Sequence, residues 1–199
     1  MRGTARRGAA LAVLALAFGC AGVPESPVPD RTPGAGLTFL PAVPYVSTPE
    51  PVVEAMLDMA RVGPNDVVYD LGCGDGRIVI AAASRRGARG VGIDIDADLV
   101  AEANNNARDA GVADRARFQV ADLFRSDFSE ATVVMLYLSP ELNAALQPQL
   151  WRQLKVGTRV VSHNFPMGAD WPPERVLRVG DRVLHLWTIR SEHKQLARQ

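Results

Sequence analysis

The feature that most restricts the fold of this chain is a glycine-rich turn directly after a short apolar run. Residues 70–76 read Asp-Leu-Gly-Cys-Gly-Asp-Gly and follow Val67, Val68 and Tyr69. Glycines at three alternate positions let the backbone turn sharply and approach a ligand closely. A turn of this kind between a buried strand and a helix predicts an α/β sheet with a ligand at the strand ends.

The turn differs from the fingerprint of a dinucleotide site. That fingerprint, G-x-G-x-x-G counted from Gly72 and Gly74, needs a third glycine where this chain has Arg77. A nicotinamide-dependent dehydrogenase is therefore the weaker alternative. A turn without any ligand is another alternative, but three alternate glycines after Asp70 exceed what a strand-to-helix turn requires.

Short apolar runs alternate with helical patterns along most of the chain. Strands are expected at residues 67–70, 90–94, 117–120, 132–137 and 158–162, and a closing hairpin at residues 175–179 and 182–189. Helices are expected from an N-cap at Thr48 to about Gly63, and at residues 77–85, 98–110 and 139–154. This order predicts an α/β fold with a Rossmann-like, doubly wound, mostly parallel sheet.

Acidic residues follow the second and third expected strands. Asp94 comes about twenty residues after the glycine turn, where a carboxylate can accept both hydroxyls of an adenosine ribose. Asp122 and Leu123 are placed to hold an adenine amino group and ring. The alternatives are a solvated acid at the end of a strand for Asp94 and an ordinary turn residue for Asp122.

These segments, in this order, resemble the cofactor motifs of the seven-strand class I S-adenosylmethionine-dependent methyltransferases. The resemblance implies a seven-stranded sheet with an antiparallel last strand. It also implies that Asp70 faces the methionine portion of S-adenosyl-L-methionine, while Asp94 binds the ribose. The cofactor-binding residues that we expect are Asp70, Gly72, Cys73, Gly74, Gly76, Asp94, Ile95, Asp122 and Leu123.

Further segments resemble the mitochondrial lysine methyltransferases of the adenine nucleotide translocase and the ATP synthase c subunit. They are Pro-Tyr-Val at residues 44–46, Asp-Gly-Arg-Ile-Val-Ile at 75–80, Asp-Leu-Phe at 122–124, and Arg-Val-Val-Ser-His-Asn-Phe-Pro at 159–166 before Trp171. The resemblance implies a lysine acceptor on a membrane-associated protein. The chain departs from that pattern at residues 136–140, Leu-Tyr-Leu-Ser-Pro. A small-molecule or lipid methyltransferase and a non-catalytic nucleoside-binding module are the alternatives.

Three residues are candidates for the acceptor channel. Tyr137 ends the fourth expected strand, where the superfamily places residues on the acceptor side, and His163 and Asn164 end the fifth. The alternatives are that Tyr137 only packs its ring and that His163 is a hydrogen-bonded structural residue. The Asn/Asp-Pro-Pro-aromatic sequence of enzymes that methylate amide or adenine nitrogens is missing after the fourth strand.

The amino-acid composition limits which partners and ligands the chain is expected to bind. The chain has 22 Lys and Arg and 22 Asp and Glu, so no net positive charge would concentrate it on nucleic acid, and we expect no nucleic-acid partner. Two cysteines, Cys20 and Cys73, exclude a cysteine-based zinc cluster. The three histidines lack ligand spacing, so we expect no metal, and we expect a monomer.

The first residues read as a bacterial secretory signal. Three arginines precede an apolar run that closes at Gly19 and Cys20, as at a lipoprotein cleavage site. We expect a leader at residues 1–20, a Pro/Gly-rich linker at 21–44, the methyltransferase domain at 45–190 and a tail at 191–199. An uncleaved anchor and a misassigned start codon are the alternatives.

This leader predicts a membrane-associated, periplasmic enzyme, held by the N-terminal signal or a lipid anchor. A cytoplasmic enzyme is the alternative, because S-adenosylmethionine is made in the cytoplasm.

Overall fold

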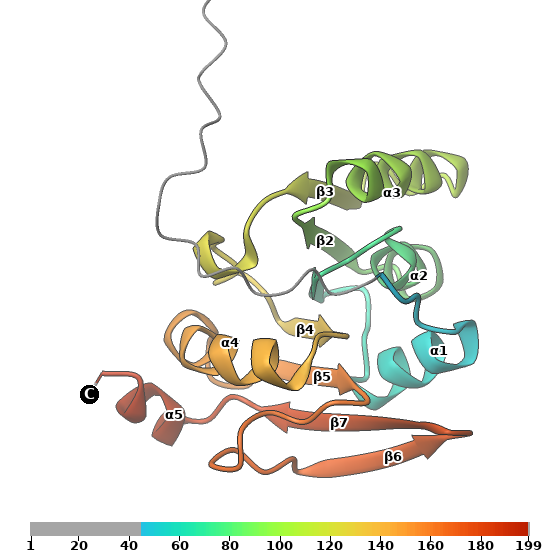
Figure 1. Ribbon diagram of the computed structural model, residues 1–199. Coiled ribbons are helices and arrows are strands. Elements are labelled where there is room, and N and C mark those ends of the chain that lie inside the picture. Colours follow the sequence, from blue (N-terminus) through green and yellow to red (C-terminus); the bar gives the residue numbers. More distant parts are fainter. Residues whose placement is uncertain (1–44, 199) are drawn as a thin grey trace, which may run out of the picture. The chain divides into compact units, whose positions relative to one another are not determined.

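Seven strands form one sheet in the computed structural model, which describes residues 45–198 (Figure 1). The strands are β1 (Val67–Leu71), β2 (Arg89–Asp94), β3 (Ala116–Val120), β4 (Val133–Leu136), β5 (Arg159–His163), β6 (Arg175–Val179) and β7 (Arg182–Thr188). Their order in the sheet is β3-β2-β1-β4-β5-β7-β6. The first five strands pair in parallel, and β7 is antiparallel to both β5 and β6. The predicted fold is confirmed.

Helices cover both faces of the sheet (Figure 1). They are α1 (Glu50–Met59), α2 (Arg77–Arg86), α3 (Ala97–Asp109), α4 (Pro140–Gln153) and α5 (Ser191–Leu196), with a short 3-10 turn η1 (Leu123–Arg125). The apolar residues of α1, α2 and α3 pack on one face. Those of α4 pack on the other face, together with the indole rings of Trp151, Trp171 and Trp187.

The central strands determine which side chains can meet at the carboxyl edge of the sheet, where β1, β2, β4 and β5 end. Every residue of β1 and β4 is buried, because helices pack on both faces of the middle of the sheet. Val133 and Met135 of β4 face the α1 side, while Val134 and Leu136 face α4. Side chains alternate along a strand, so the next residue, Tyr137, lies on the α1 side. His163 is two residues after Val161, which also packs on the α1 side, and the two rings therefore meet.

The expected N-cap of the first helix was wrong. The N-cap position of α1 is Pro49, and no side chain caps the helix there. The Thr48 side chain is instead buried, and its Oγ1 lies 3.2 Å from Nδ1 of His163. Because the Thr48 hydroxyl bonds His163 at the end of β5, it does not accept a hydrogen bond from the first turn of α1.

The segment expected as a tail contains helix α5. His193 is buried and stacks against the Trp151 ring, with ring centroids 5.4 Å apart. Lys194 Nζ donates to the carbonyl oxygens of Trp151, Arg152 and Leu154 at 2.7, 2.7 and 2.6 Å. These carbonyls end α4, and a cation there completes their hydrogen bonding.

The expected leader and linker, residues 1–44, lie outside the described residues. Within residues 45–198, no helix has the length and apolar content needed to cross a membrane.

Candidate active site

The glycine turn is fixed to the end of β2 by backbone hydrogen bonds. The N–H groups of Gly72 and Cys73 both donate to the carbonyl oxygen of Ile93, at 2.8 and 3.0 Å. Gly74 has a positive φ of 53°, and a Cβ there would lie 2.2 Å from the ring of Tyr45. Only glycine combines this backbone conformation with so close a neighbour. The turn therefore places bare backbone at the carboxyl edge of the sheet.

Asp94 joins the turn to the next helix. Its Oδ2 accepts from the N–H of Gly74 at 2.8 Å, and its Oδ1 accepts from the N–H of Asp96 at 3.0 Å. The side chain is only partly buried. Each carboxylate oxygen keeps a lone pair for a further donor, so the group can still accept two hydroxyls of a ribose.

Asp70 brings a buried acid to the same edge. The residue is 3% exposed. Burial, and then the negative charges of Asp94 and Asp75, raise the pKa of Asp70 well above its ordinary value. A cation bound here would relieve that repulsion, whereas a pyrophosphate would add to it. The edge thus suits a sulfonium and an ammonium group better than a dinucleotide.

The remaining predicted cofactor residues line the same edge. Ala121 donates its N–H to the carbonyl oxygen of Asp94 at 2.9 Å, which holds the start of η1 beside β2. Asp122 caps η1 by accepting from the N–H of Phe124 at 2.9 Å, and Leu123 packs against the α4 side of the core. Ile95 is 73% exposed and stands free of the core.

Cys73 and Gly76 serve the local packing of the turn. The thiol of Cys73 is buried, and a Cβ on Gly92 would lie 2.7 Å from its sulfur. Burial raises the pKa of Cys73, so the thiol stays protonated and is a poor nucleophile. Gly76 is the N-cap of α2, and a Cβ there would lie 2.6 Å from the Phe118 ring.

Aromatic rings lie at the ends of β4 and β5, where the acceptor channel was predicted. The rings of Tyr137 and His163 lie 3.9 Å apart between centroids, and the ring of Phe165 lies 6.5 Å from that of Tyr137. His163 is completely buried, and its Nε2 has no hydrogen-bond partner among the described residues. Burial, aided by the charge of Arg182, lowers the pKa of His163 to about 4. The imidazole is therefore neutral at physiological pH.

Asn164 is tied to β7. Its φ is 65°, a conformation that asparagine tolerates better than most residues. Its backbone N–H donates to the carbonyl oxygen of Val183 at 2.6 Å, and its Oδ1 accepts from the N–H of Val183 at 3.1 Å. One end of its amide is thus engaged by the sheet, and its place in the acceptor channel stays a prediction.

Tyr45 is a residue at this edge that the sequence did not single out. Its ring lies against Gly74, at the start of the described chain. The one sequence signal was its place in the segment shared with the lysine methyltransferases. No periodicity or spacing relates it to the glycine turn.

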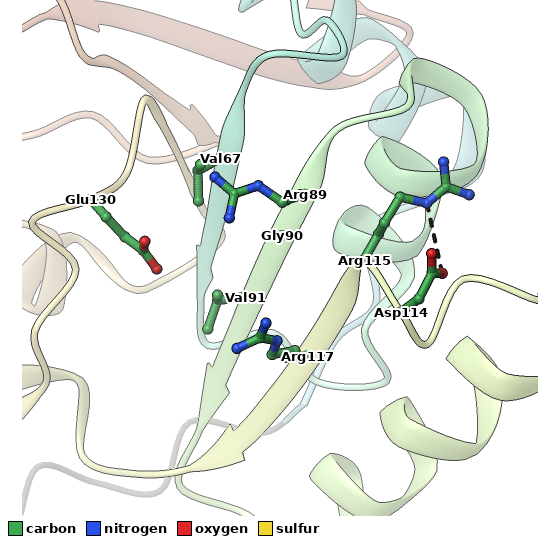
Figure 2. A pocket seen from close by; sticks show the side chains of 8 residues that line it. All are labelled: Val67, Arg89, Gly90, Val91, Asp114, Arg115, Arg117 and Glu130. Carbon is green, nitrogen blue, oxygen red and sulfur yellow. Dashed lines mark ion pairs between the residues drawn. The ribbon is translucent and has the colours of Figure 1, made fainter.

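Two hollows of the surface lie away from the predicted site. One of about 90 Å³ opens at the amino ends of β1, β2 and β3 (Figure 2). Its lining residues are Val67, Arg89, Gly90, Val91, Asp114, Arg115, Arg117 and Glu130. Another, of about 380 Å³, is lined by Tyr69, Asp127, Ser129 and Glu130. Neither contains a predicted site residue. Nor do three or more His, Cys, Asp or Glu side chains gather as a metal site within residues 45–198.

Comparison with known proteins agrees with this geometry. A crystal structure described as an RNA methyltransferase from Salinibacter ruber, in complex with S-adenosyl-L-homocysteine, is 55% identical. It matches with a TM-score of 0.72 and covers 73% of this chain and 95% of that chain. The fold and the acid-lined glycine turn define an S-adenosylmethionine-dependent methyltransferase.

Residues 70–175 match the family described as the ANTKMT methyltransferase domain. The chain belongs to this family. A protein-lysine N-methyltransferase of Saccharolobus islandicus (strain REY15A) is 44% identical over 163 residues, which are 79% of this chain and 100% of that protein. The human lysine N-methyltransferase of the ATP synthase c subunit is 32% identical, over 84% of this chain and 70% of the human protein.

The buried neutral imidazole makes a prediction about acid stability. The pKa of His163 is about 4 in the folded protein and near 6.5 when unfolded, so protons bind the unfolded chain first. Stability from this group is present above pH 6.5 and is lost as the pH falls toward 4. Between pH 7 and pH 5 the loss should be about 2 kcal/mol, and His163→Gln should not show it.

Urea unfolding at both pH values measures this difference. The wild type and His163→Gln share every other titrating group, including His185 and His193, so the difference between their pH dependences isolates His163. Equal pH dependence of the two proteins would show that His163 is not buried in its neutral form.

Proposed function

We propose that this methyltransferase transfers methyl groups to lysine side chains of proteins. The observation that carries the proposal is the close pair of rings of Tyr137 and neutral His163, which lie on the strands next to the acid-lined turn. A lysine stem is aliphatic and packs well on aromatic rings, while its amine needs a site without positive charge. Two relatives support the same acceptor, since those 44% and 32% identical are both lysine N-methyltransferases.

The reaction is a direct displacement. The lone pair of the lysine nitrogen forms a bond to the methyl carbon as the carbon–sulfur bond breaks, and the electron pair stays on sulfur. The neutral thioether of S-adenosylhomocysteine leaves, and the methylated nitrogen carries the positive charge. Because sulfur is a good leaving group, the protein mainly aligns the nitrogen and excludes water.

The acid-lined edge is assigned to the cofactor in this proposal. Asp94 binds the ribose hydroxyls, Asp70 faces the methionine portion, and Asp122 with Leu123 holds the adenine. The support is that Asp94 keeps free lone pairs beside the bare backbone of Gly74, and that Asp70 lies where a cation lowers the energy.

The ribose assignment predicts a loss of affinity in Asp94→Ala. Two hydrogen bonds to a carboxylate should be lost, and S-adenosylhomocysteine binding should weaken by about 2 to 3 kcal/mol, or roughly 30-fold or more in Kd. Calorimetry measures this. Asp96→Ala is a matched control, because Asp96 caps α3 and belongs to no part of the proposed cofactor site. An unchanged Kd in folded Asp94→Ala would refute the assignment.

The acceptor assignment predicts a defect in Tyr137→Phe. If the hydroxyl orients the amine, the rate should fall at least about tenfold, which is about 1.4 kcal/mol in barrier, with cofactor affinity preserved. The wild-type rate should also rise with pH as the bound lysine loses its proton. Steady-state kinetics on a methylatable protein measure both. A wild-type rate in Tyr137→Phe would show that the hydroxyl does not orient the amine and that the ring only packs.

An RNA acceptor is the competing function, because the 55% identical structure is described as an RNA methyltransferase. The position of Arg89, Arg115 and Arg117 weighs against it. Figure 2 shows Arg89 and Arg117 on the side of Glu130, with Arg115 paired to Asp114, all at the amino ends of the strands. That edge is opposite to the acceptor rings, and the chain has no net charge.

Labelled methyl transfer separates these functions. The protein is incubated with methyl-labelled S-adenosylmethionine and a lysate of the source organism, and protein, RNA, lipid and small molecules are then separated. We expect label on protein lysine that survives nuclease treatment. Label confined to RNA, lipid or metabolites would refute the lysine proposal.

We further propose that residues 1–20 export the enzyme and that lipid on Cys20 holds it at a membrane. Support comes from the arginines, apolar run and Gly19-Cys20 of the sequence alone. Intact mass of membrane-extracted protein should show loss of residues 1–19 and an acylated cysteine. A full-length, unmodified cytosolic protein would contradict it.

A further inference from the structure

Residues 45–48 cross the active edge before α1 begins, and we call this segment the strap. Its carboxyl end is anchored: Thr48 is buried, its carbonyl oxygen accepts from Nη1 of Arg77 at 3.0 Å, and its hydroxyl meets His163. Its amino end is more open. Tyr45 is 48% exposed, and its ring covers Gly74. The anchored end therefore holds a half-exposed phenol ring against the glycine turn.

Gly74 lies between Tyr45 and Asp94. The N–H of Gly74 donates to Oδ2 of Asp94 at 2.8 Å, and the Tyr45 ring occupies the space where a Cβ of residue 74 would lie. A cofactor that bonds Asp94 through its ribose and reaches Asp70 with its methionine portion must pass along this turn. That portion then lies within the neighbourhood of the Tyr45 ring.

The methionine portion carries a carboxylate as well as an ammonium group. The acids that favour the ammonium and the sulfonium, Asp70, Asp75 and Asp94, repel the carboxylate. A donor is needed to hold it there. Arg77 is the nearby cation, but its Nε already donates to both carboxylate oxygens of Asp75, at 2.9 and 3.1 Å, and Nη1 is taken by the strap.

The phenol of Tyr45 is a suitable donor. Burial and the charge of Asp75 raise the pKa of Tyr45, so the hydroxyl keeps its proton at physiological pH. The Tyr45 hydroxyl also bonds the Asp75 carboxylate. Because Arg77 donates to both oxygens of that carboxylate, the hydroxyl can turn from Asp75 to a ligand and leave the carboxylate paired.

We propose that the Tyr45 hydroxyl donates a hydrogen bond to the carboxylate of the cofactor's methionine portion. This inference rests on the cofactor placement given under the proposed function. It adds the Tyr45 hydroxyl as the group that binds the methionine carboxylate. Tyr45 thereby selects the complete cofactor over nucleosides that lack the carboxylate.

The test compares two ligands on two tyrosine variants. The ligands are S-adenosylhomocysteine and its decarboxylated analogue, which keeps the nucleoside, thioether and amine. Tyr45→Phe keeps the ring on Gly74 and removes only the hydroxyl. Tyr69→Phe is the matched control, because its hydroxyl bonds Glu130 at 2.8 Å near the opposite edge of the sheet. Calorimetry on the full-length protein gives each Kd.

We expect Tyr45→Phe to weaken S-adenosylhomocysteine about tenfold and to change the Kd of the decarboxylated analogue less than about twofold. Tyr69→Phe should change neither. Equal loss for both ligands, or no loss for S-adenosylhomocysteine, would overturn the inference. Neither readout involves a methyl acceptor, so the lysine proposal can fail without affecting it. Failure of the wild type to bind S-adenosylhomocysteine would instead refute the cofactor placement itself.

Discussion

The hydrogen bonds between the glycine turn and the end of β2 are the constraint on which the active edge depends. Gly72 and Cys73 share the carbonyl oxygen of Ile93, and Gly74 donates to Asp94. The N–H groups of a turn are costly to bury without partners, and here β2 supplies the partners of Gly72, Cys73 and Gly74. The contact needs close approach, since a Cβ on Gly92 would strike both Cys73 and Phe118. Rigidity of the turn thus follows from strand pairing and does not require a ligand.

This arrangement divides the carboxyl edge into two electrostatic halves. The ends of β1 and β2 carry Asp70 and Asp94, and burial, together with the negative charges of Asp94 and Asp75, holds the pKa of Asp70 high. The ends of β4 and β5 carry Tyr137 and His163, and the imidazole of His163 is neutral at physiological pH. A cationic methyl donor is favoured on one half, and a neutral amine is tolerated on the other. The order of strands β2-β1-β4-β5 makes these halves neighbours.

The sequence predicted the fold well because its signals are local. The apolar run before Asp70, the alternate glycines and the spacing to Asp94 each lie within one strand-turn-helix unit, and parallel pairing then places the strand ends together. Contacts that join distant segments were not predictable. Thr48 read as a helix cap because its own neighbours, Pro49 and Glu50, are typical of a helix start, whereas its actual partner is His163, 115 residues away.

The same reasoning explains the missed residues. Tyr45 covers Gly74 although α1 and β1 lie between them in the sequence, and no periodicity predicts that contact. Helix α5 has only six residues, too few for an amphipathic pattern, and it is held by Lys194 on the end of α4. The bond between the Asn164 amide and β7 was likewise not foreseen, because it depends on a positive φ and on a partner 19 residues away. These are tertiary effects, which override local propensity.

The neutral state of His163 also limits how a lysine could be activated. Transfer of a proton from an amine with a pKa near 10.4 to an imidazole with a pKa of about 4 would cost about 9 kcal/mol of free energy. Releasing the same proton to solvent at pH 7 costs only about 5 kcal/mol. The imidazole is therefore a poorer proton acceptor than solvent, by roughly 4 kcal/mol. What the stack can supply is desolvation, which disfavours the ammonium form and lowers the pKa of an entering lysine before it reaches the methyl group. On this argument the acceptor half works by being uncharged and dry, and a substitution that placed a charge beside Tyr137 should harm it more than one that removed an aromatic contact.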